Sequence, residues 1–313
     1  MYGATLLFVE ILKELLCPLP VKACLTKGCS EAPKACKLNL AIQIFKGDYH
    51  RKFMLQLISS QLDMDRMDYL KRDSFYSGVA EGNISSDRLI QMMTVVNDQL
   101  VIEEKGIYSV EKFLMARRLM YWQVYFHKTS LVAELILTKV LKRAKELIQK
   151  GIVLNCSDSL LYFMNNKIEL ETFDNNTLDK FAKLDDFDIV SALKSWLNND
   201  DFILSNLSKM IINRDLLKIK LSSEKFSKSD LESLQLTFSK ENQISIQDSS
   251  YFIFKGKIKN QAYSVQAEPI RILKKDNTVE DVVEASDQLN LKSISKEVTK
   301  YYLCFPKQLI KVK

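Results

Sequence analysis

Apolar and polar residues follow each other along most of this chain with the spacing of an amphipathic α-helix. The longest such pattern covers residues 111–150, which contain no glycine or proline and precede Gly151, a residue typical of a helix C-terminus. We therefore expect one long helix there, on which other helices pack. Shorter patterns predict helices at residues 4–16, 38–47, 51–73, 86–93, 157–165, 175–198 and 200–212.

The pattern changes in two places. Residues 98–110, DQLVIEEKGIYSV, alternate in a way that predicts a short β-hairpin with its turn near Lys105-Gly106. Beyond residue 215 the chain contains one predicted helix, at 228–238, and several β-like runs separated by turn signals: LLKIKLS (216–222), SYFIFKGKIK (250–259), AYSVQ (262–266) and PIRILKK (269–275). We therefore expect a helical domain at 38–215 and a smaller α+β domain at 216–313.

Residues 1–37 form a further segment, a predicted helix followed by CPLPVKACLTKGCSEAPKAC (17–36). This stretch holds four of the six cysteines, Cys17, Cys24, Cys29 and Cys36, and three of the five prolines. Six, four and six residues separate consecutive cysteines, whereas common zinc sites use pairs about two to four residues apart. We interpret the segment as a linker or insertion, with a structural metal site as the alternative.

The composition favours a globular, mainly α protein. With 47% hydrophobic and 27% charged residues the chain can bury a core, and it has only 8 glycines and 5 prolines in 313 residues. No stretch offers the roughly 20 uncharged apolar residues of a membrane span, and the first residues lack the basic start of a signal peptide. We therefore expect a cytoplasmic protein with reduced thiols.

The net charge makes a polyanion a candidate partner. The chain carries a formal charge of +6, with a pI near 8.8, which suits nucleic acid or a small anionic substrate. The densest basic run, KVLKRAKELIQK (139–150), contains apolar residues at helical spacing, and charges in such runs usually face water. We interpret this run as the solvated face of a helix, with nucleic-acid binding as the weaker hypothesis.

Two stretches place charged and aromatic residues on single helix faces, at about 100° per residue. In QLDMDRMDYLKRDSFYSG (61–78) one face holds Asp65, Asp68, Tyr69 and Arg72, with Asp73 at its edge. In the predicted long helix one face holds Arg117, Tyr121, Tyr125 and Lys128. Because carboxylates bind hard cations and basic side chains pair with phosphate, the two faces suit a metal-bound polyphosphate. The alternative is a structural ion network with ordinary core tyrosines.

The first of these stretches also resembles a known family. SSQLDMDRMDYLKRDSFYSGVAEGNISSDRLI (59–90) is similar to the D-x-D-R-x-D-Y-L-x-R-D-x-x-x-x-G segment of the HD-domain phosphohydrolase superfamily, in the bacterial, dGTPase-like branch of deoxynucleoside triphosphate triphosphohydrolases. The resemblance continues through RRLMYWQVYFHK (117–128) and PIRILKKDNTVEDVVEASDQL (269–289), and covers most of residues 38–313. It implies an HD-type helical bundle followed by a smaller α+β region.

The resemblance also implies roles for individual residues. The family holds a divalent metal (Mg, Mn, Fe or Zn) with a histidine, an adjacent His-Asp pair and a later aspartate, which Asp65 matches. The implied substrate contacts are Arg66 and Arg117 to phosphate, Tyr69 under the sugar, Asp73 to the ribose hydroxyl, and Tyr121 and Tyr125 around base and sugar. The implied reaction is attack of water on the α-phosphate of a deoxynucleoside triphosphate, which yields a deoxynucleoside and tripolyphosphate. A homo-oligomer is expected.

The chain departs from this family on the metal side. His50 and His127 are its histidines, and each precedes a basic residue, so the sequence has no His-Asp pair. Because one aspartate does not hold a catalytic metal as three or four ligands do, we expect hydrolysis by this chain to be impaired. Two explanations are open. The family's first helices precede residue 1 in a longer protein, or the protein is a non-catalytic nucleotide-binding or regulatory member that keeps the substrate cleft.

Overall fold

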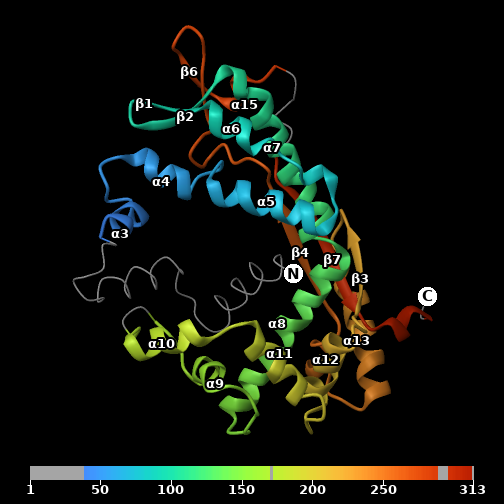
Figure 1. Ribbon diagram of the computed structural model, residues 1–313. Helices are drawn as coiled ribbons and strands as arrows, with labels where there is room; N and C mark the ends of the chain where they lie inside the picture. Colours follow the sequence, from blue (N-terminus) through green and yellow to red (C-terminus); the bar gives the residue numbers. More distant parts are fainter. Residues whose placement is uncertain (1–38, 170–171, 288–294, 312–313) are drawn as a thin grey trace. The chain divides into compact units, whose positions relative to one another are not determined.

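The structure is a computed structural model that describes residues 39–169, 172–287 and 295–311 (Figure 1). The expected N-terminal helix and the cysteine-rich segment at 1–37 lie outside these residues. Within them, thirteen α-helices and seven short strands confirm a mainly α protein with a smaller α+β part. In the described part of the chain no helix is both long and apolar enough to cross a membrane.

Most of the predicted helices are present, several of them divided. In chain order the α-helices are α3 (Asn39–Lys46), α4 (Lys52–Ile58), α5 (Met64–Ser77), α6 (Ser86–Met92), α7 (Ile107–Met120), α8 (Lys128–Gln149), α9 (Asp158–Asn165), α10 (Asn175–Lys183), α11 (Asp186–Ser195), α12 (Phe202–Ile212), α13 (Lys228–Asn242), α14 (Ile246–Ser249) and α15 (Val282–Ala285). The strands are β1 (Met93–Val96), β2 (Gln99–Glu103), β3 (Lys218–Ser222), β4 (Phe254–Asn260), β5 (Arg271–Leu273), β6 (Val279–Asp281) and β7 (Val298–Phe305).

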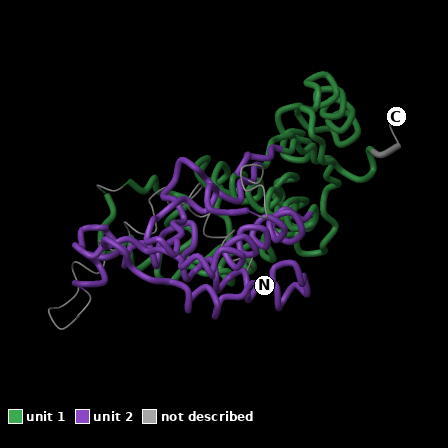
Figure 2. Tube along the Cα trace, turned by 90° about the horizontal axis from the view of Figure 1, so that it is seen from above, with its two compact units in different colours: residues 1–28, 128–258, 300–313 green, residues 29–127, 259–299 purple. Residues whose placement is uncertain are grey.

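The chain divides into two compact units, coloured separately in Figure 2. Of the described residues, unit 1 contains 128–258 and the C-terminal segment from 300, and unit 2 contains 39–127 together with 259–299. The chain therefore leaves unit 2, forms most of unit 1, and returns to unit 2 before its last strand. The domain boundary expected between residues 215 and 216 lies where helical patterns give way to β-like runs, and it stays a prediction.

Each of the two sheets is small. In unit 2 the strand order is β1-β2-β5-β6, with β2 and β5 parallel and the outer pairs antiparallel. The second sheet has the order β3-β7-β4, and β3 pairs with β7 in antiparallel register, with Ile219 opposite Cys304. Both sheets join strands that lie far apart in the sequence, so neither could form from a single local segment.

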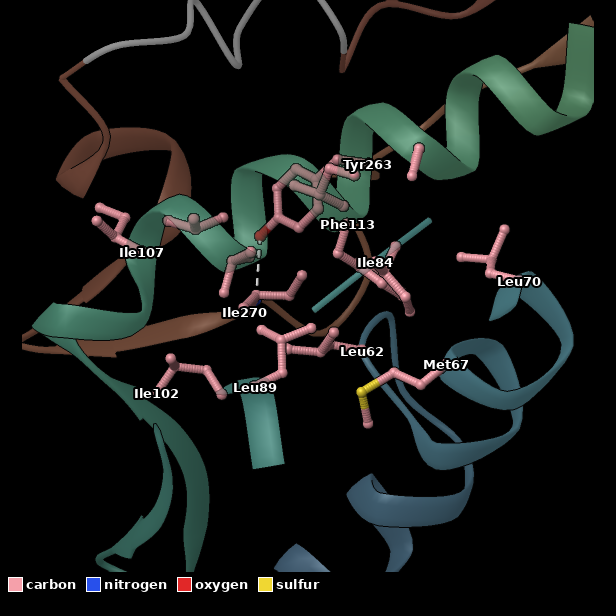
Figure 3. Close-up of a cluster of buried hydrophobic side chains, with 14 of the residues drawn as sticks. Leu62, Met67, Leu70, Ile84, Leu89, Ile102, Ile107, Phe113, Tyr263 and Ile270 are labelled. Carbon is pink, nitrogen blue, oxygen red and sulfur yellow. Dashed lines mark hydrogen bonds between the residues drawn. The ribbon is translucent and has the colours of Figure 1, made fainter. Parts of the chain in front are cut away.

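The core of unit 2 lies between α5, α6, α7 and the four-stranded sheet. Its fully buried members include Leu70 of α5, Leu89 of α6 and Phe113 of α7, and residues from the C-terminal part of the chain, such as Tyr263 and Ile270, join them (Figure 3). Burying a leucine or phenylalanine side chain contributes about 1.5–3 kcal/mol. The apolar positions of three helices and a distant segment therefore stabilise one another.

The predicted hairpin at 98–110 is wrong in its position. The hairpin is formed by β1 and β2, and its turn lies at Asn97 and Asp98, which have φ values of 49° and 61°. Asn and Asp tolerate this left-handed conformation, which two-residue hairpin turns require. Gly106 instead ends a 3₁₀ turn that leads into α7.

The predicted helix at 111–150 is also wrong as a single element. α7 ends at Met120, and residues Tyr121–Tyr125 form a π-helical turn before Phe126 leaves the helical conformation with φ −99° and ψ 19°. The Phe126 amide donates to the Tyr121 carbonyl, five residues earlier, at 2.7 Å. Composition does not show this break, because the turn contains neither glycine nor proline. Short π turns often lie at functional sites.

Two other predicted helices are divided by N-caps. The helix expected at 51–73 is α4 followed by α5, and the Asp63 side chain accepts from the Arg66 amide at the start of α5. The helix expected at 175–198 is α10 followed by α11, which begins with a capping box between Asp185 and Asp188. Aspartate satisfies the free amides of a first helical turn and thereby starts a new helix within a continuous apolar pattern.

Part of the basic run at 139–150 faces the interior of unit 1. Arg143 forms a bidentate pair with Asp201, the N-cap of α12, with its Nη2 at 2.5 Å from the carboxylate. The Lys139 ammonium lies 4.8 Å from the ring centre of Phe254, in the geometry of a cation–π contact. Lys142 and Lys150 are exposed. The interpretation of the run as a solvated face therefore holds for only some of its charges.

The Arg143–Asp201 pair should make the stability of unit 1 depend on pH. Burial alone raises the pKa of Asp201, but the bonds from Arg143 and the Leu204 amide outweigh it and hold the pKa below its usual value. The stabilisation is therefore present above the unfolded-state pKa of about 3.9 and is lost as pH falls below it. Asp201→Asn, which keeps an N-cap, should cost about 1–3 kcal/mol at pH 7.

The measurement is urea unfolding of the wild-type chain and of Asp201→Asn at pH 7 and at pH 3, followed by circular dichroism. The two proteins should differ at pH 7, and the difference should be smaller at pH 3, because the pH then approaches the lowered pKa of Asp201. Asp201→Ala serves as a second variant, because loss of the cap adds about 1 kcal/mol at both pH values. Equal stability of wild type and Asp201→Asn at pH 7 would show that the charge pair contributes nothing.

Candidate functional site

α5 carries polar side chains on a face that lies partly in the interior of unit 2. Asp63, which is 4% exposed, caps its first turn, and Gly78 ends it in the left-handed conformation with φ 71°. Between these ends the helix buries Met67 and Leu70 on its core side, and Asp73 beside them. A buried aspartate needs hydrogen-bond partners, because an unpaired charge in the interior is costly.

Tyr125 supplies the partner for Asp73. The phenol of Tyr125, in the π turn that follows α7, donates to Oδ2 of Asp73 at 2.7 Å. Asp73 is 8% exposed. Burial, and then the hydrogen bond to Asp73, raise the pKa of Tyr125 far above its ordinary value. The phenol therefore stays protonated and keeps the proton that it donates to Asp73.

Three tyrosine rings lie around this bond. The ring of Tyr69 lies 6.1 Å from that of Tyr125, and Tyr121 lies 5.1 Å from Tyr125, both edge to face. Burial and the neighbouring Tyr121 raise the pKa of Tyr69, whereas the guanidinium groups of Arg117 and Arg66 act in the opposite sense. Both arginines therefore lie close enough to Tyr69 to act on its charge.

Arg117 has an unusual set of contacts for a half-buried cation. Its Nη1 donates to the backbone carbonyl of Ala262 at 3.1 Å, and its buried Nε has no partner within the described chain. Among the residues that the structure describes, no carboxylate lies within ion-pair distance of Arg117. Its positive charge therefore lies beside Tyr69 with no counter-ion among the described residues.

Arg66 is partly engaged by its own helix. Its Nε donates to the Ser60 carbonyl at 2.8 Å and lies 3.2 Å from the Asp63 carboxylate. The charge of the Arg66 guanidinium also acts on the nearby phenol of Tyr69, whose pKa it lowers. The fork of Arg66 is thus oriented by the first turn of α5 toward the tyrosine cluster.

Asp65 differs from the other predicted site residues. Its side chain is exposed, and in the described part of the chain it has no hydrogen-bond or ion-pair partner. Asp68 and Arg72, which were expected on the same face, form an exposed i,i+4 ion pair, so the interpretation as a surface network is correct for them. The structure therefore brings together six predicted residues, Arg66, Tyr69, Asp73, Arg117, Tyr121 and Tyr125, and leaves Asp65 outside their contacts.

The described residues do not fit the divalent metal that the resemblance implies. Over 39–169, 172–287 and 295–311, no three His, Cys, Asp or Glu side chains come together as a metal site. His50 is exposed and lies against the ring of Tyr49, and His127 is exposed after the π turn. Asp65 alone offers one ligand, and we assign no chemical step to a metal here.

One contributor to this site is not predicted by the sequence. The run AYSVQ (262–266), expected as a strand, forms a loop, and its first residue provides the carbonyl that accepts from Arg117. Gln61, at the other end of the site, holds the same loop. The local pattern carries no signal for these contacts, because they join residues more than a hundred positions apart.

The fold and this cluster can now be compared with known proteins. Residues 84–159 match the family model of the HD associated region. The solved structure of a phosphohydrolase from Bacteroides thetaiotaomicron is 44% identical and superposes with a TM-score of 0.86, over 96% of this chain and 76% of that one. The uncharacterized protein YwfO of Bacillus subtilis is 40% identical over 177 residues, which are 56% of this chain and 39% of that protein.

A more distant relative carries a named activity. The deoxynucleoside triphosphate triphosphohydrolase SAMHD1 homolog of Dictyostelium discoideum is 28% identical over 144 residues, 43% of this chain and 27% of that protein. This chain thus spans less than half the length of the curated relatives described here. The close structural match and the HD associated region show that the chain belongs to the HD-domain superfamily, and they confirm the expected mainly α, HD-type fold.

The Tyr125–Asp73 bond should be measurable as stability. Tyr125→Phe removes the donor and leaves a buried carboxylate oxygen unpaired, which should cost about 1–3 kcal/mol of unfolding free energy. Tyr121→Phe is the matched control, since the neighbouring Tyr121 hydroxyl has no such partner within the described residues. Urea unfolding at pH 7 should show a clear loss for Tyr125→Phe alone. Equal losses in the two variants would contradict a specific role for the bond.

Proposed function

We propose that this protein is an HD-superfamily phosphohydrolase of deoxynucleoside triphosphates and that the six-residue cluster is the substrate side of its site. The observation that carries the proposal is Arg117, a half-buried cation beside Tyr69 that has no carboxylate partner in the described chain. An arginine is always charged, and its partial burial costs free energy unless an anion approaches it. The phosphate of a nucleotide is such an anion.

The remaining residues suit the sugar and the base. Tyr125 donates a hydrogen bond to one oxygen of the Asp73 carboxylate. Among the described residues no side chain donates to the other oxygen, so that oxygen can accept a hydrogen bond from a hydroxyl of a ribose. The faces and edges of Tyr69 and Tyr121 offer flat apolar surface to a sugar and a base. The family resemblance and the similarity to a triphosphohydrolase from Dictyostelium support a deoxynucleoside triphosphate as the substrate.

The proposed reaction is attack of water on the α-phosphate, with release of a deoxynucleoside and tripolyphosphate. A divalent metal, where its ligands are present, would supply activation of the water and offset phosphate charge, but the described residues do not form such a site. By resemblance Asp65 is the residue of this chain that would bind the metal. Because the sequence has no His-Asp pair, we propose that this chain binds the nucleotide but turns it over weakly by itself.

The second candidate is a non-catalytic nucleotide-binding or regulatory protein. The absence of a His-Asp pair from the sequence favours this candidate, because the cluster could bind phosphate and sugar without a metal. Self-association and nucleic-acid binding stay further predictions. The second of these would show as binding that weakens steeply with salt.

Nucleotide binding should raise the thermal stability of the chain. A ligand at a hundred times its Kd contributes about 2.7 kcal/mol, which corresponds to a rise in Tm of roughly 5 °C or more. With dGTP as the probe and no metal added, Arg117→Ala should weaken binding about 10- to 100-fold, as expected for a charged hydrogen bond. Arg72→Ala, which changes a surface arginine of α5, is the control and should bind like wild type.

Differential scanning fluorimetry over a dGTP titration checks this. No shift of wild type with dGTP, dATP, dCTP or dTTP would count against both candidate functions. A shift that Arg117→Ala and Arg72→Ala reduce equally would mean that the nucleotide binds through general charge.

Turnover is a separate question. With added Mg²⁺ or Mn²⁺, we expect this chain to release little or no tripolyphosphate from dGTP, because one aspartate provides too few metal ligands. Phosphorus NMR distinguishes tripolyphosphate from stepwise release of single phosphates. Binding without turnover would favour the regulatory candidate for this chain. Robust release of tripolyphosphate, lost in Asp65→Ala, would show that the chain forms a complete catalytic centre.

A further inference from the structure

Residues 261–270 contact Arg117 of α7 and Gln61, which lies just before α5, and we call this segment the strap. We propose that the strap positions Arg117 for its anion and sets the distance between α5 and the α7 segment, with Gln61 and Tyr263 as its positioning residues. The identity of the anion as a phosphate rests on the function proposed above. The hold of the strap on Arg117 does not depend on that function.

Near the start of α5 the backbone of the strap is bound by Gln61, and Gln56 of α4 donates to the side chain of Glu268. The Gln61 amide, 8% exposed, donates from Nε2 to the carbonyls of Ser264 at 2.9 Å and Glu268 at 2.8 Å. Its Oε1 accepts from the Ser264 amide at 2.7 Å. Gln61 lies two residues before Asp63, the N-cap of α5. Three hydrogen bonds therefore join the strap to the start of the helix that carries Tyr69 and Asp73.

At the α7 end the strap is bound to the arginine itself. Ala262 is completely buried, and its carbonyl accepts from Nη1 of Arg117 at 3.1 Å. This is the hydrogen bond that orients the guanidinium of Arg117 within the described residues. A guanidinium is planar with its donors in a fixed fork, so one bond of this kind largely determines where the others point.

The strap is closed on itself by Tyr263. This residue is completely buried beside Phe113 of α7, and its hydroxyl donates to Asp281 Oδ2 at 2.8 Å and accepts from the Ile270 amide at 3.2 Å (Figure 3). The first contact ties the strap to the end of β6, and the second joins its two ends. The Ala262 carbonyl is therefore held in place by a buried side chain next to it.

These contacts have a consequence for recognition. A flexible arginine loses side-chain entropy when it binds an anion, and a side chain already oriented by the protein loses less. A loosened strap should therefore weaken the contact to an anion while leaving the tyrosines, which face the sugar and base, in place. This pattern of loss distinguishes a positioning role from a general structural one.

The test compares Tyr263→Phe and Gln61→Ala with two controls of the same type on exposed positions of unit 2, Tyr108→Phe and Gln91→Ala. Tyr263→Phe keeps the buried ring and is the milder change. Calorimetry measures the Kd of the full chain for dGTP and for deoxyguanosine. Both strap variants should bind dGTP about tenfold more weakly, the factor for one charge-assisted hydrogen bond. The two strap variants should bind deoxyguanosine with wild-type affinity. The two controls should bind both dGTP and deoxyguanosine with wild-type affinity.

A ligand-free measurement accompanies it. The ¹⁵Nε signal of Arg117, assigned with Arg117→Lys, should be distinct and slow to exchange in wild type and in both controls, because this N–H is buried. In the strap variants it should move to the position of exposed arginines.

An unchanged Arg117 signal in both strap variants would overturn the proposal. So would equal losses for dGTP and deoxyguanosine, or unchanged dGTP binding despite a moved signal. If the signal moves but wild type binds no nucleotide, the strap does position Arg117, and it is the proposed nucleotide function that fails.

Discussion

The hydrogen bond from Tyr125 to Asp73 is the constraint on which the arrangement of the site depends. A carboxylate that is 8% exposed must be paired, and the described chain offers it this phenol. Tyr125 belongs to a π turn, where one extra residue rotates everything that follows by about 100°. The bond and the turn therefore support each other, because the bond stabilises a conformation that a regular helix would not adopt, and the turn keeps Tyr125 beside α5.

Much of this site could be predicted from helical spacing, because its residues recur on one face of each helix. Arg117, Tyr121 and Tyr125 do cluster, although a π turn replaces the last part of the predicted helix. The boundary between buried and exposed surface could not be predicted in the same way. This boundary divides the predicted face of α5: Tyr69 and Asp73 belong to the cluster, whereas Asp68 is exposed to water. Angles around one helix do not show which neighbours will cover it.

The parts that sequence could not show are those that join distant segments. The strap lies about two hundred positions after Gln61 and lacks regular secondary structure, so neither periodicity nor spacing indicates it. The hairpin turn at Asn97 and Asp98 is a smaller case of the same kind. Its position depends on which residues tolerate a left-handed backbone and on how β2 pairs with β5, a strand from the C-terminal part of the chain.

Substrate recognition and metal chemistry are physically separable in this architecture. The proposed recognition surface is held by hydrogen bonds from Tyr125 to Asp73, from Arg117 to the Ala262 carbonyl and from the Ser264 amide to Gln61. A metal centre stabilises a fold only where its ligands are assembled, and the described residues, which include Arg117 and Asp73, contain no such assembly. The surface that we assign to the nucleotide can therefore be complete before any metal ligand is added. Under the proposed function, binding of the anion depends on Arg117 and the strap, whereas turnover depends on metal ligands beyond the one that Asp65 would offer.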